Sequence, residues 1–162
     1  MRKKIIKIFA VLSLFGILIL KLFFIDYMVI SGNSMSESYK NREVVLIKKN
    51  YEMLNRYDVI VAKTNGTGVQ GKVIKRVIGL PNETVQIVDG YVYINGDKLE
   101  DDVVNIKMDY AGIAETEITL ADDEYFLLGD NRNASEDSRY EWLGIVNEKQ
   151  IIGKVFAKIY SK

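Results

Sequence analysis

The sequence predicts a mainly β protein, an antiparallel sheet domain preceded by a single N-terminal transmembrane helix. Two observations support this: a long apolar segment from Ile5 to Ile25, and a remainder made of short β-branched and aromatic runs between turn residues. The 162 residues suffice for one such domain with one core. We therefore expect a cytoplasmic tip and membrane anchor over residues 1–30, and an extracytoplasmic β-rich domain over residues 31–162.

The N-terminal segment has the length and flanks of a membrane anchor. Its first residues are basic, and charge interrupts the apolar stretch only at Lys7 and Lys21. A helix of roughly 20 residues crosses a bilayer core, and lysines near its ends reach the interface. The basic start places the N-terminus in the cytoplasm. A cleaved signal peptide is the main alternative, because the uninterrupted run covers only Ile8–Leu20, and a buried soluble helix is another. Bulky residues follow that run and offer no small-residue cleavage site, which favours a retained anchor.

The rest of the chain reads as strands joined by tight turns. Asp89-Gly90 and Asn95-Gly96 are dipeptides typical of two-residue hairpins, and Pro81 lies in a turn. Residues 95–123 are the least patterned and most acidic, and we expect an excursion from the main sheet there. Solvated turns explain those acids better than calcium, so no metal is expected. Strands are expected at Val44–Lys48, Val59–Ala62, Lys72–Ile78, Thr84–Val88, Tyr91–Ile94, Lys98-Leu99, Tyr125–Leu128 and Ile151–Tyr160.

Composition excludes several classes of function. The chain has 22 basic and 22 acidic residues, but five basic residues and one acid lie in the first 30, so the remainder has 17 against 21 and a net charge of −4. A mildly acidic domain argues against nucleic-acid binding. The chain has no histidine and no cysteine, which excludes a Ser-His-Asp triad, a thiol nucleophile and a disulfide. The lack of cysteine fits an extracytoplasmic domain, although many cytosolic proteins share it.

Ser34 is a candidate nucleophile. It follows the apolar segment closely, and Gly32-Asn33 before it favours a tight turn that exposes a side chain. Taken alone, this segment favours an ordinary juxtamembrane loop serine. Without histidine, the leading base for such a serine is a lysine with a lowered pKa.

Lys75 is the candidate for that base. Apolar residues flank Lys75-Arg76, and neighbours in a strand face opposite sides, so one cation should point toward the core. Burial lowers the pKa of a lysine, and a neutral amine can accept a hydroxyl proton. The alternative is that both cations are solvated or ion-paired on an edge strand.

A polar cluster, Gly129 to Arg139, follows the predicted strand Tyr125–Leu128. Such a segment is costly to bury unless its groups pair with one another. It is therefore either the scaffold of an active site or a plain polar loop.

Together these clusters resemble the type I bacterial signal peptidases, membrane-anchored Ser/Lys proteases, in a short Gram-positive-like form. The resemblance spans nearly the whole chain and implies an antiparallel β domain with a hydrophobic surface toward the membrane. It implies that Ser34 is the nucleophile and Lys75 the general base, with no cofactor. The matching segments are the anchor, Gly32–Met35, Tyr57–Ile60, Lys75–Pro81 and Gly129–Arg139.

The resemblance also implies supporting roles for polar residues around that pair. Ser135 would orient the Lys75 amine by hydrogen bonding. Asp137 would form an ion-pair network with Arg76 and Arg139, and Asp130 would help to hold the loop.

Two departures from the family pattern concern the segment around Ser34. Ser36-Glu37-Ser38-Tyr39 replaces the usual x-Pro-Thr-Leu, which removes a fixed turn. Gly32 stands where some members place a serine hydroxyl in the oxyanion hole, so this hole would rely on the Ser34 N–H and any contribution from water or Gly32. The residues expected to form the shallow substrate pockets are Ile30, Met35, Tyr39, Val73 and Ile74.

The implied function is removal of N-terminal signal peptides from exported preproteins at the membrane surface, with cleavage after small residues in an Ala-x-Ala pattern. The implied partners are secreted preproteins and the lipid bilayer, at the cell membrane, and a monomer is expected. Two alternatives stay open. One is a self-cleaving Ser/Lys protease of the repressor type. The other is a non-catalytic, membrane-tethered accessory or pilus-assembly protein on the same fold.

Overall fold

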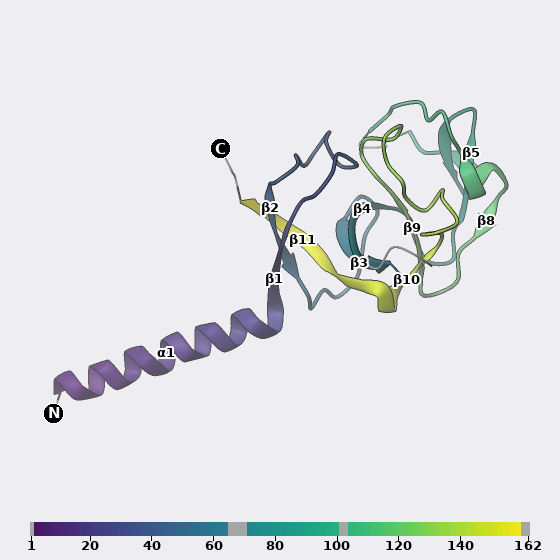
Figure 1. Cartoon of the computed structure of the whole chain (residues 1–162). Coiled ribbons are helices and arrows are strands. Elements are labelled where there is room, and N and C mark those ends of the chain that lie inside the picture. Colours follow the sequence, from purple (N-terminus) through teal and green to yellow (C-terminus); the bar gives the residue numbers. More distant parts are fainter. Residues whose placement is uncertain (1, 65–70, 101–103, 160–162) are drawn as a thin grey trace.

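The protein consists of a long N-terminal helix and two antiparallel sheets in a computed structural model, which describes residues 2–64, 71–100 and 104–159 (Figure 1). The larger sheet has seven strands in the order β1-β2-β11-β3-β4-β9-β10, and the smaller has four in the order β7-β6-β5-β8. The elements are α1 (Arg2–Phe24), β1 (Ile25–Val29), β2 (Val44–Lys48), β3 (Val59–Thr64), β4 (Gly71–Gly79), β5 (Thr84–Val88), β6 (Tyr91–Ile94), β7 (Asp97–Lys98), η1 (Gly112–Glu115), β8 (Ile118–Thr119), β9 (Glu124–Leu128), β10 (Val146–Asn147), η2 (Glu148–Gln150) and β11 (Ile151–Ile159).

The predicted β architecture and both predicted hairpin turns are confirmed. Asp89 and Gly90 have φ values of 51° and 84°, and Asn95 and Gly96 have 52° and 84°. Two consecutive left-handed residues match the twist of antiparallel strands, which is why these dipeptides connect β5 to β6 and β6 to β7. The two-residue strands β8 and β10 were not predicted, because so short a run carries no periodicity. Tyr160, the last residue of the predicted final strand, lies outside the described residues.

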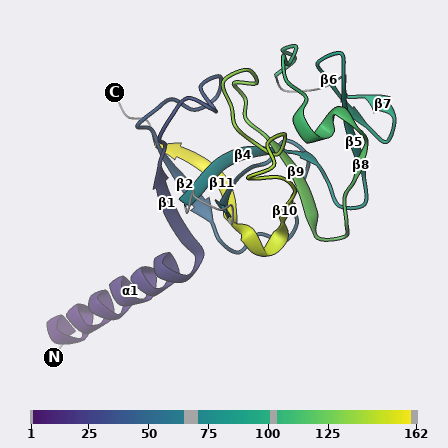
Figure 2. The same cartoon turned by 45° about the vertical axis from the view of Figure 1, so that its right-hand side comes forward.

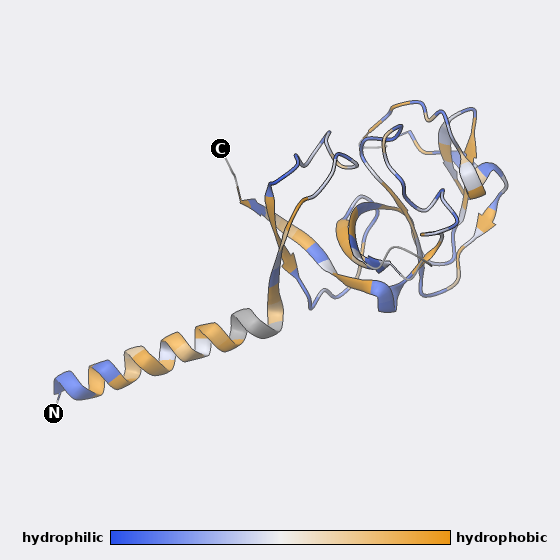
Figure 3. Ribbon diagram, in the orientation of Figure 1, coloured by the Kyte–Doolittle hydropathy of each residue, from blue (hydrophilic) through white to orange (hydrophobic). Residues whose placement is uncertain are grey.

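Helix α1 covers most of the predicted anchor and projects away from the sheets (Figures 1 and 2). Hydrophilic residues gather at its N-terminal end and hydrophobic ones along most of its length (Figure 3). The predicted helix is thus confirmed. Counting only the described residues, however, none of the helices is both long and apolar enough to cross a membrane.

The chain turns from helix to strand within the segment expected to be anchor, residues 1–30. Residues 25–29 form β1, which pairs antiparallel with β2 from Ile25↔Lys48 to Val29↔Val44. The apolar run concealed this change, because periodicity cannot separate a short apolar strand from the end of an apolar helix. The large sheet therefore takes its first strand from directly after α1.

Three clusters of buried side chains form the core. One joins the two sheets, with Ile78 and Phe126 of the large sheet packed on Val85 and other residues of the small sheet. A Cβ atom at Gly79 would lie 2.6 Å from Val85 and 2.9 Å from Phe126, so glycine at this position allows the close approach. A second cluster lies around β3, β4 and β9, and the third includes Ile30, next to the turn that carries Ser34.

The pairing of β4 leaves part of its edge open. Every residue of β3 pairs with a residue of β4, from Thr64↔Gly71 to Val59↔Arg76. On the other side β9 begins to pair only at Arg76. In the described part of the chain, residues 71–75 therefore pair with β3 alone.

Candidate active site

Ser34 sits in a turn that its own backbone hydrogen bonds close. The Ser36 N–H donates to the Asn33 carbonyl at 3.1 Å, and the Ser38 N–H donates to the Met35 carbonyl at 2.9 Å. Gly32 enters the turn with a φ of 95°, a conformation that favours glycine. Met35 is only 1% exposed and anchors the turn in the core, while Ser34 stays half-buried.

The polar loop after β9, residues 129–139, holds this turn by hydrogen bonds from Asn131. The Asn131 N–H donates to the Ser34 carbonyl at 3.0 Å. The Asn131 side-chain amide donates to the Ser36 hydroxyl at 3.0 Å and to the Asn33 carbonyl at 3.3 Å. Sequence reasoning did not single out Asn131. Its position inside Gly-Asp-Asn-Arg was the one available signal.

Strand β4 carries Lys75 into the same region, where its side chain is buried and 3% exposed. Burial lowers the pKa of Lys75 to about 8, because the charged amine loses hydration. Asp137 counteracts this and raises the pKa, Arg139 lowers it, and Glu136 and Asp130 raise it. A pKa near 8 leaves a useful neutral fraction of the amine at neutral pH, which a solvated lysine lacks.

Ser135 is buried, and its hydroxyl has no hydrogen-bond partner among the described residues. Leaving a buried hydroxyl unpaired costs about 1–3 kcal/mol, so such groups commonly belong to functional sites. A Cβ atom at Gly129 would overlap the Ser135 hydroxyl and lie 2.6 Å from the Ser34 carbonyl oxygen. The glycine thus lets Ser135 pack closely beside the turn that carries Ser34.

Two buried ion pairs support the site, and their partners differ from the predicted network. Arg76 holds the Asp130 carboxylate with Nε at 2.7 Å and Nη2 at 2.5 Å. Arg139 holds Asp137 with Nε at 2.7 Å and Nη2 at 2.9 Å. The prediction joined Asp137 to both arginines. Lys75 and Arg76 alternate along β4, so Arg76 meets Asp130 while the field of Asp137 acts on Lys75.

The Asp137–Arg139 pair also fixes the loop around Ser135. Asp137 accepts the Gly129 N–H at 3.0 Å, and Arg139 Nη2 donates to the carbonyl oxygens of Arg132 at 2.6 Å and Ser135 at 3.1 Å. Both side chains of the pair are almost fully buried. A charge pair with this many additional hydrogen bonds is compensated for burial and sets the loop conformation.

Ser34 and Lys75 line one cleft of about 340 Å³. It runs between the turn at residues 31–34 and the open edge of β4 at residues 72–75, and Ala134 and Glu136 of the polar loop close its third side. The two candidate catalytic residues, far apart in sequence, are thus brought to one cavity.

The walls of this cleft are only partly those expected. Val73 and Ile74 line it as predicted, together with Met28 and Trp142, which were not predicted. The other expected wall residues belong elsewhere: Ile30 and Met35 are buried in the third core cluster and Tyr39 packs against it. Met35 and Ile30 are buried in the core although they lie close to Ser34 in sequence, so sequence proximity to Ser34 did not place them in the cleft.

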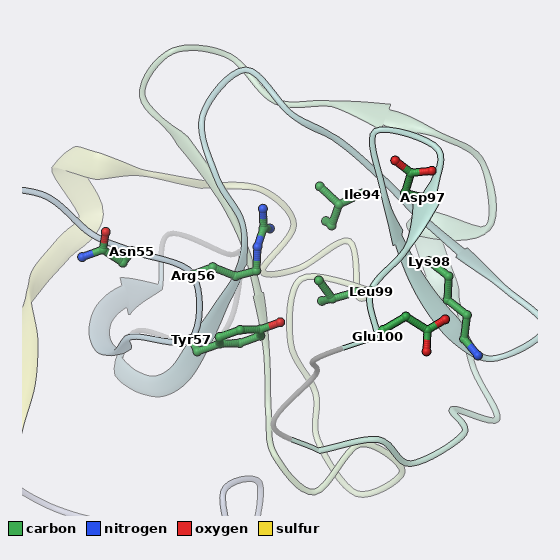
Figure 4. A pocket seen from close by; sticks show the side chains of 8 residues that line it. All are labelled: Asn55, Arg56, Tyr57, Ile94, Asp97, Lys98, Leu99 and Glu100. Atoms are coloured by element: carbon green, nitrogen blue, oxygen red, sulfur yellow. The ribbon is translucent and has the colours of Figure 1, made fainter.

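A second hollow, of about 590 Å³, lies where the small sheet meets the large one (Figure 4). Arg56 is held there by the Glu83 carboxylate at 2.9 and 2.6 Å and by the Ile78 carbonyl. The hollow is lined by Asn55, Arg56, Tyr57, Ile94, Asp97, Lys98, Leu99 and Glu100.

Within the described ranges no group of three or more Asp or Glu side chains could hold a metal ion.

Comparisons with known proteins point to one family. The family model described as signal peptidase, peptidase S26, matches residues 2–160. Signal peptidase I S of Bacillus subtilis is 35% identical over 158 residues, which cover 91% of this chain and 83% of that protein. Signal peptidase I of Leptolyngbya laminosa is 34% identical over 140 residues, covering 81% and 66%. A crystal structure of a signal peptidase I from Enterococcus faecalis V583 superposes with a TM-score of 0.51 at 30% identity, covering 66% of this chain and all of that one.

Proposed function

Since the chain belongs to the signal peptidase family, peptidase S26, and is a serine protease, we propose that it removes signal peptides from secreted preproteins with a Ser34–Lys75 dyad. The observation that carries the proposal is the common cleft: a half-buried serine and a buried lysine of lowered pKa line the same cavity. A chain without histidine or cysteine has few other ways to activate a hydroxyl at neutral pH.

The reaction is acyl transfer in two steps. Neutral Lys75 accepts the Ser34 hydroxyl proton as the oxygen attacks the scissile carbonyl, and the resulting oxyanion is held by the Ser34 N–H with a contribution from Gly32. The Lys75 ammonium then gives its proton to the leaving amine, and the C–N bond breaks. Lys75 next takes a proton from a water that attacks the acyl-enzyme carbonyl. The ester bond to Ser34 then breaks, Lys75 returns the proton to the Ser34 oxygen, and the signal peptide leaves with a free carboxyl end. In the reacting enzyme Ser135 would accept a hydrogen bond from the Lys75 amine, which leaves the amine lone pair free to take the Ser34 proton.

An extended substrate fits the open edge of β4. Backbone groups at residues 71–75 can pair with a peptide strand, as in other cases of strand addition. Val73 and Ile74 project to opposite faces of that strand, with Trp142 and Met28 as further walls of the cleft. By resemblance to the family, we propose that these walls accept small side chains in an Ala-x-Ala pattern before the cut.

We propose that the membrane is the site of action, with residues 1–30 as tip and anchor, the N-terminus cytoplasmic and residues 31–162 outside. Large apolar side chains of α1 are exposed along the helix, including Phe9, Leu12 and Phe15. Further exposed apolar residues, among them Phe156 and Ile159, lie on β11, which pairs with β2 in the large sheet. A monomer acting beside the bilayer brings Ser34 to preproteins whose signal peptides lie in that bilayer.

The test compares the detergent-solubilised protein with Ser34→Ala and Lys75→Met on a preprotein that carries an Ala-x-Ala site. Ser13→Ala, in α1, and Lys63→Met, exposed on β3, are matched controls for the two chemical changes. We expect cleavage at the site by the wild type and both controls, and a loss of at least about a thousand-fold in the two dyad variants. Cleavage that survives Lys75→Met would refute the base assignment. No cleavage by any protein on several preproteins would favour the non-catalytic accessory function.

A further inference from the structure

Glu136 places a solvent-exposed negative charge in the active-site cleft. It is exposed and lines the same cavity as Ser34 and Lys75. Among the described residues its carboxylate has no hydrogen-bond or ion-pair partner. The next residue, Asp137, is buried and paired with Arg139. Glu136 is therefore the carboxylate of this loop that is open to a charge brought by a substrate.

The pairing of β4 decides which part of a substrate meets Glu136. Strand β9 occupies the edge of β4 from Arg76 onward, so an added peptide strand can pair only along residues 71–75. In the proposed function the residues before the cut lie there, against Val73 and Ile74. We take the added strand to run in the same direction as β4, so that the chain beyond the cut continues past Lys75 along the part of the cleft lined by Ala134 and Glu136.

We propose that Glu136 selects substrates by the charge of the first two residues after the cut, the +1 and +2 positions, favouring basic side chains and disfavouring acidic ones. The inference rests on the proposed function. It adds a determinant of substrate specificity after the cut, whereas the Ala-x-Ala pattern describes only the residues before the cut. Electrostatic complementarity of this kind attracts the matching charge, and the like charge is repelled. Lys72 lines the cleft on the other side of Lys75, so its positive charge faces the residues before the cut.

The experiment uses three peptides with one Ala-x-Ala site that differ only at +1 and +2, with Lys, Gln or Glu at both positions. The full-length wild type, Glu136→Gln, Glu136→Lys and the control Glu141→Gln, an exposed acid of the same loop region, are compared by kcat/KM on each peptide. Ratios are taken within one protein. A change in the Lys75 pKa, which Glu136 raises, affects all three peptides equally and cancels.

For the wild type we expect the Lys peptide to be cleaved roughly three-fold faster than the Gln peptide and the Glu peptide correspondingly slower, the size typical of exposed ion pairs. The ratio should fall to about one in Glu136→Gln and invert in Glu136→Lys, stay unchanged in Glu141→Gln, and shrink with added salt. A purely structural role of Glu136 would not invert a charge preference.

Two results would overturn the inference in different ways. A wild-type ratio of one, or a ratio unchanged in Glu136→Gln, would refute the role of Glu136 while cleavage of the Gln peptide leaves the proposed function standing. Failure of the wild type to cleave even the Gln peptide would refute the proposed function and the selectivity with it.

Discussion

Lys75 and Arg76 are chain neighbours with opposite roles in the site. The Arg76 guanidinium donates hydrogen bonds to the Asp130 carboxylate on one side and to the Tyr57 carbonyl, at 2.8 Å, on the other. Lys75 is buried and has no such partner among the described residues, and the loss of hydration outweighs the attraction of Asp137, so its pKa falls. The alternation of a strand is what separates a structural cation from a candidate base.

The lowered pKa predicts how cleavage depends on pH. Lys75 acts as a base only when neutral, so protonation below its pKa of about 8 removes activity. We expect kcat/KM for a neutral Ala-x-Ala peptide to rise about ten-fold per pH unit below that value and to level off above it. The profile of the wild type is measured beside Lys63→Met, which should keep the same midpoint. A midpoint near pH 5, or no acid limb, would contradict the assignment of Lys75.

At the scale of elements, two segments far apart in sequence build the site together. The turn of Ser34 lacks the proline usual in the family, yet it is held from several sides. Asn131 reaches the Ser36 hydroxyl, Arg76 Nη2 donates to the Ser38 hydroxyl at 3.2 Å, and Lys158 donates to the Ser38 carbonyl at 3.2 Å. Hydrogen bonds from the polar loop and from β4 and β11 thus replace the local stiffness of proline.

The contact between the polar loop and the Ser34 turn predicts the effect of one added methyl group. A Cβ atom at Gly129 would overlap the Ser135 hydroxyl and crowd the Ser34 carbonyl, so Gly129→Ala must push the loop away from the turn. We expect a loss of about 1–3 kcal/mol in the free energy of unfolding, and a fall in kcat larger than the change in KM. Denaturant unfolding and peptide cleavage measure the two effects.

The control for that substitution is Gly16→Ala, in α1, where an added Cβ would meet no atom within 4 Å. It should change both stability and kcat little. Gly129→Ala with wild-type kcat would show that the close packing of Ser135 against the Ser34 turn has no role in catalysis.

At the scale of the whole molecule, the helix and the sheets are joined through one edge strand. Strand β1 follows α1 without a linker and closes the edge of the large sheet against β2. The helix itself stands clear of the domain (Figures 1 and 2). The apolar surface of α1 is therefore free to contact surroundings outside the domain. Because β1 follows α1 directly, the cleft stays near the helix.

This arrangement predicts that membrane association and peptide cleavage can be separated. Leu12→Asp with Phe15→Asp places two charges at the middle of the exposed apolar helix, where each costs about 2.5–3.5 kcal/mol in a bilayer. We expect the variant to lose binding to phospholipid vesicles in flotation experiments and to keep cleavage of a short soluble peptide. Met53→Asp with Tyr110→Asp, which changes exposed apolar residues of the sheet domain, should still bind. Vesicle binding by the α1 variant would refute the anchoring role.

The sequence by itself determined the features that depend on composition and local geometry. The absence of histidine and cysteine excluded a Ser-His-Asp triad and a thiol nucleophile, the dipeptides Asp89-Gly90 and Asn95-Gly96 specified two hairpins, and the order of motifs indicated the family. Composition and short local motifs determine each of these features, so no tertiary contact is needed to predict them.

Only the tertiary structure decided which polar groups pair and which side chains line the cleft. Asp130 rather than Asp137 holds Arg76, Met28 and Trp142 rather than Ile30 and Met35 form the walls, and residues 25–29 leave the helix to form β1. The physical reason is that these outcomes depend on strand register and on packing between distant segments. The Arg76–Asp130 pair joins residues 54 apart in the chain, and β9 decides how much of the β4 edge stays open.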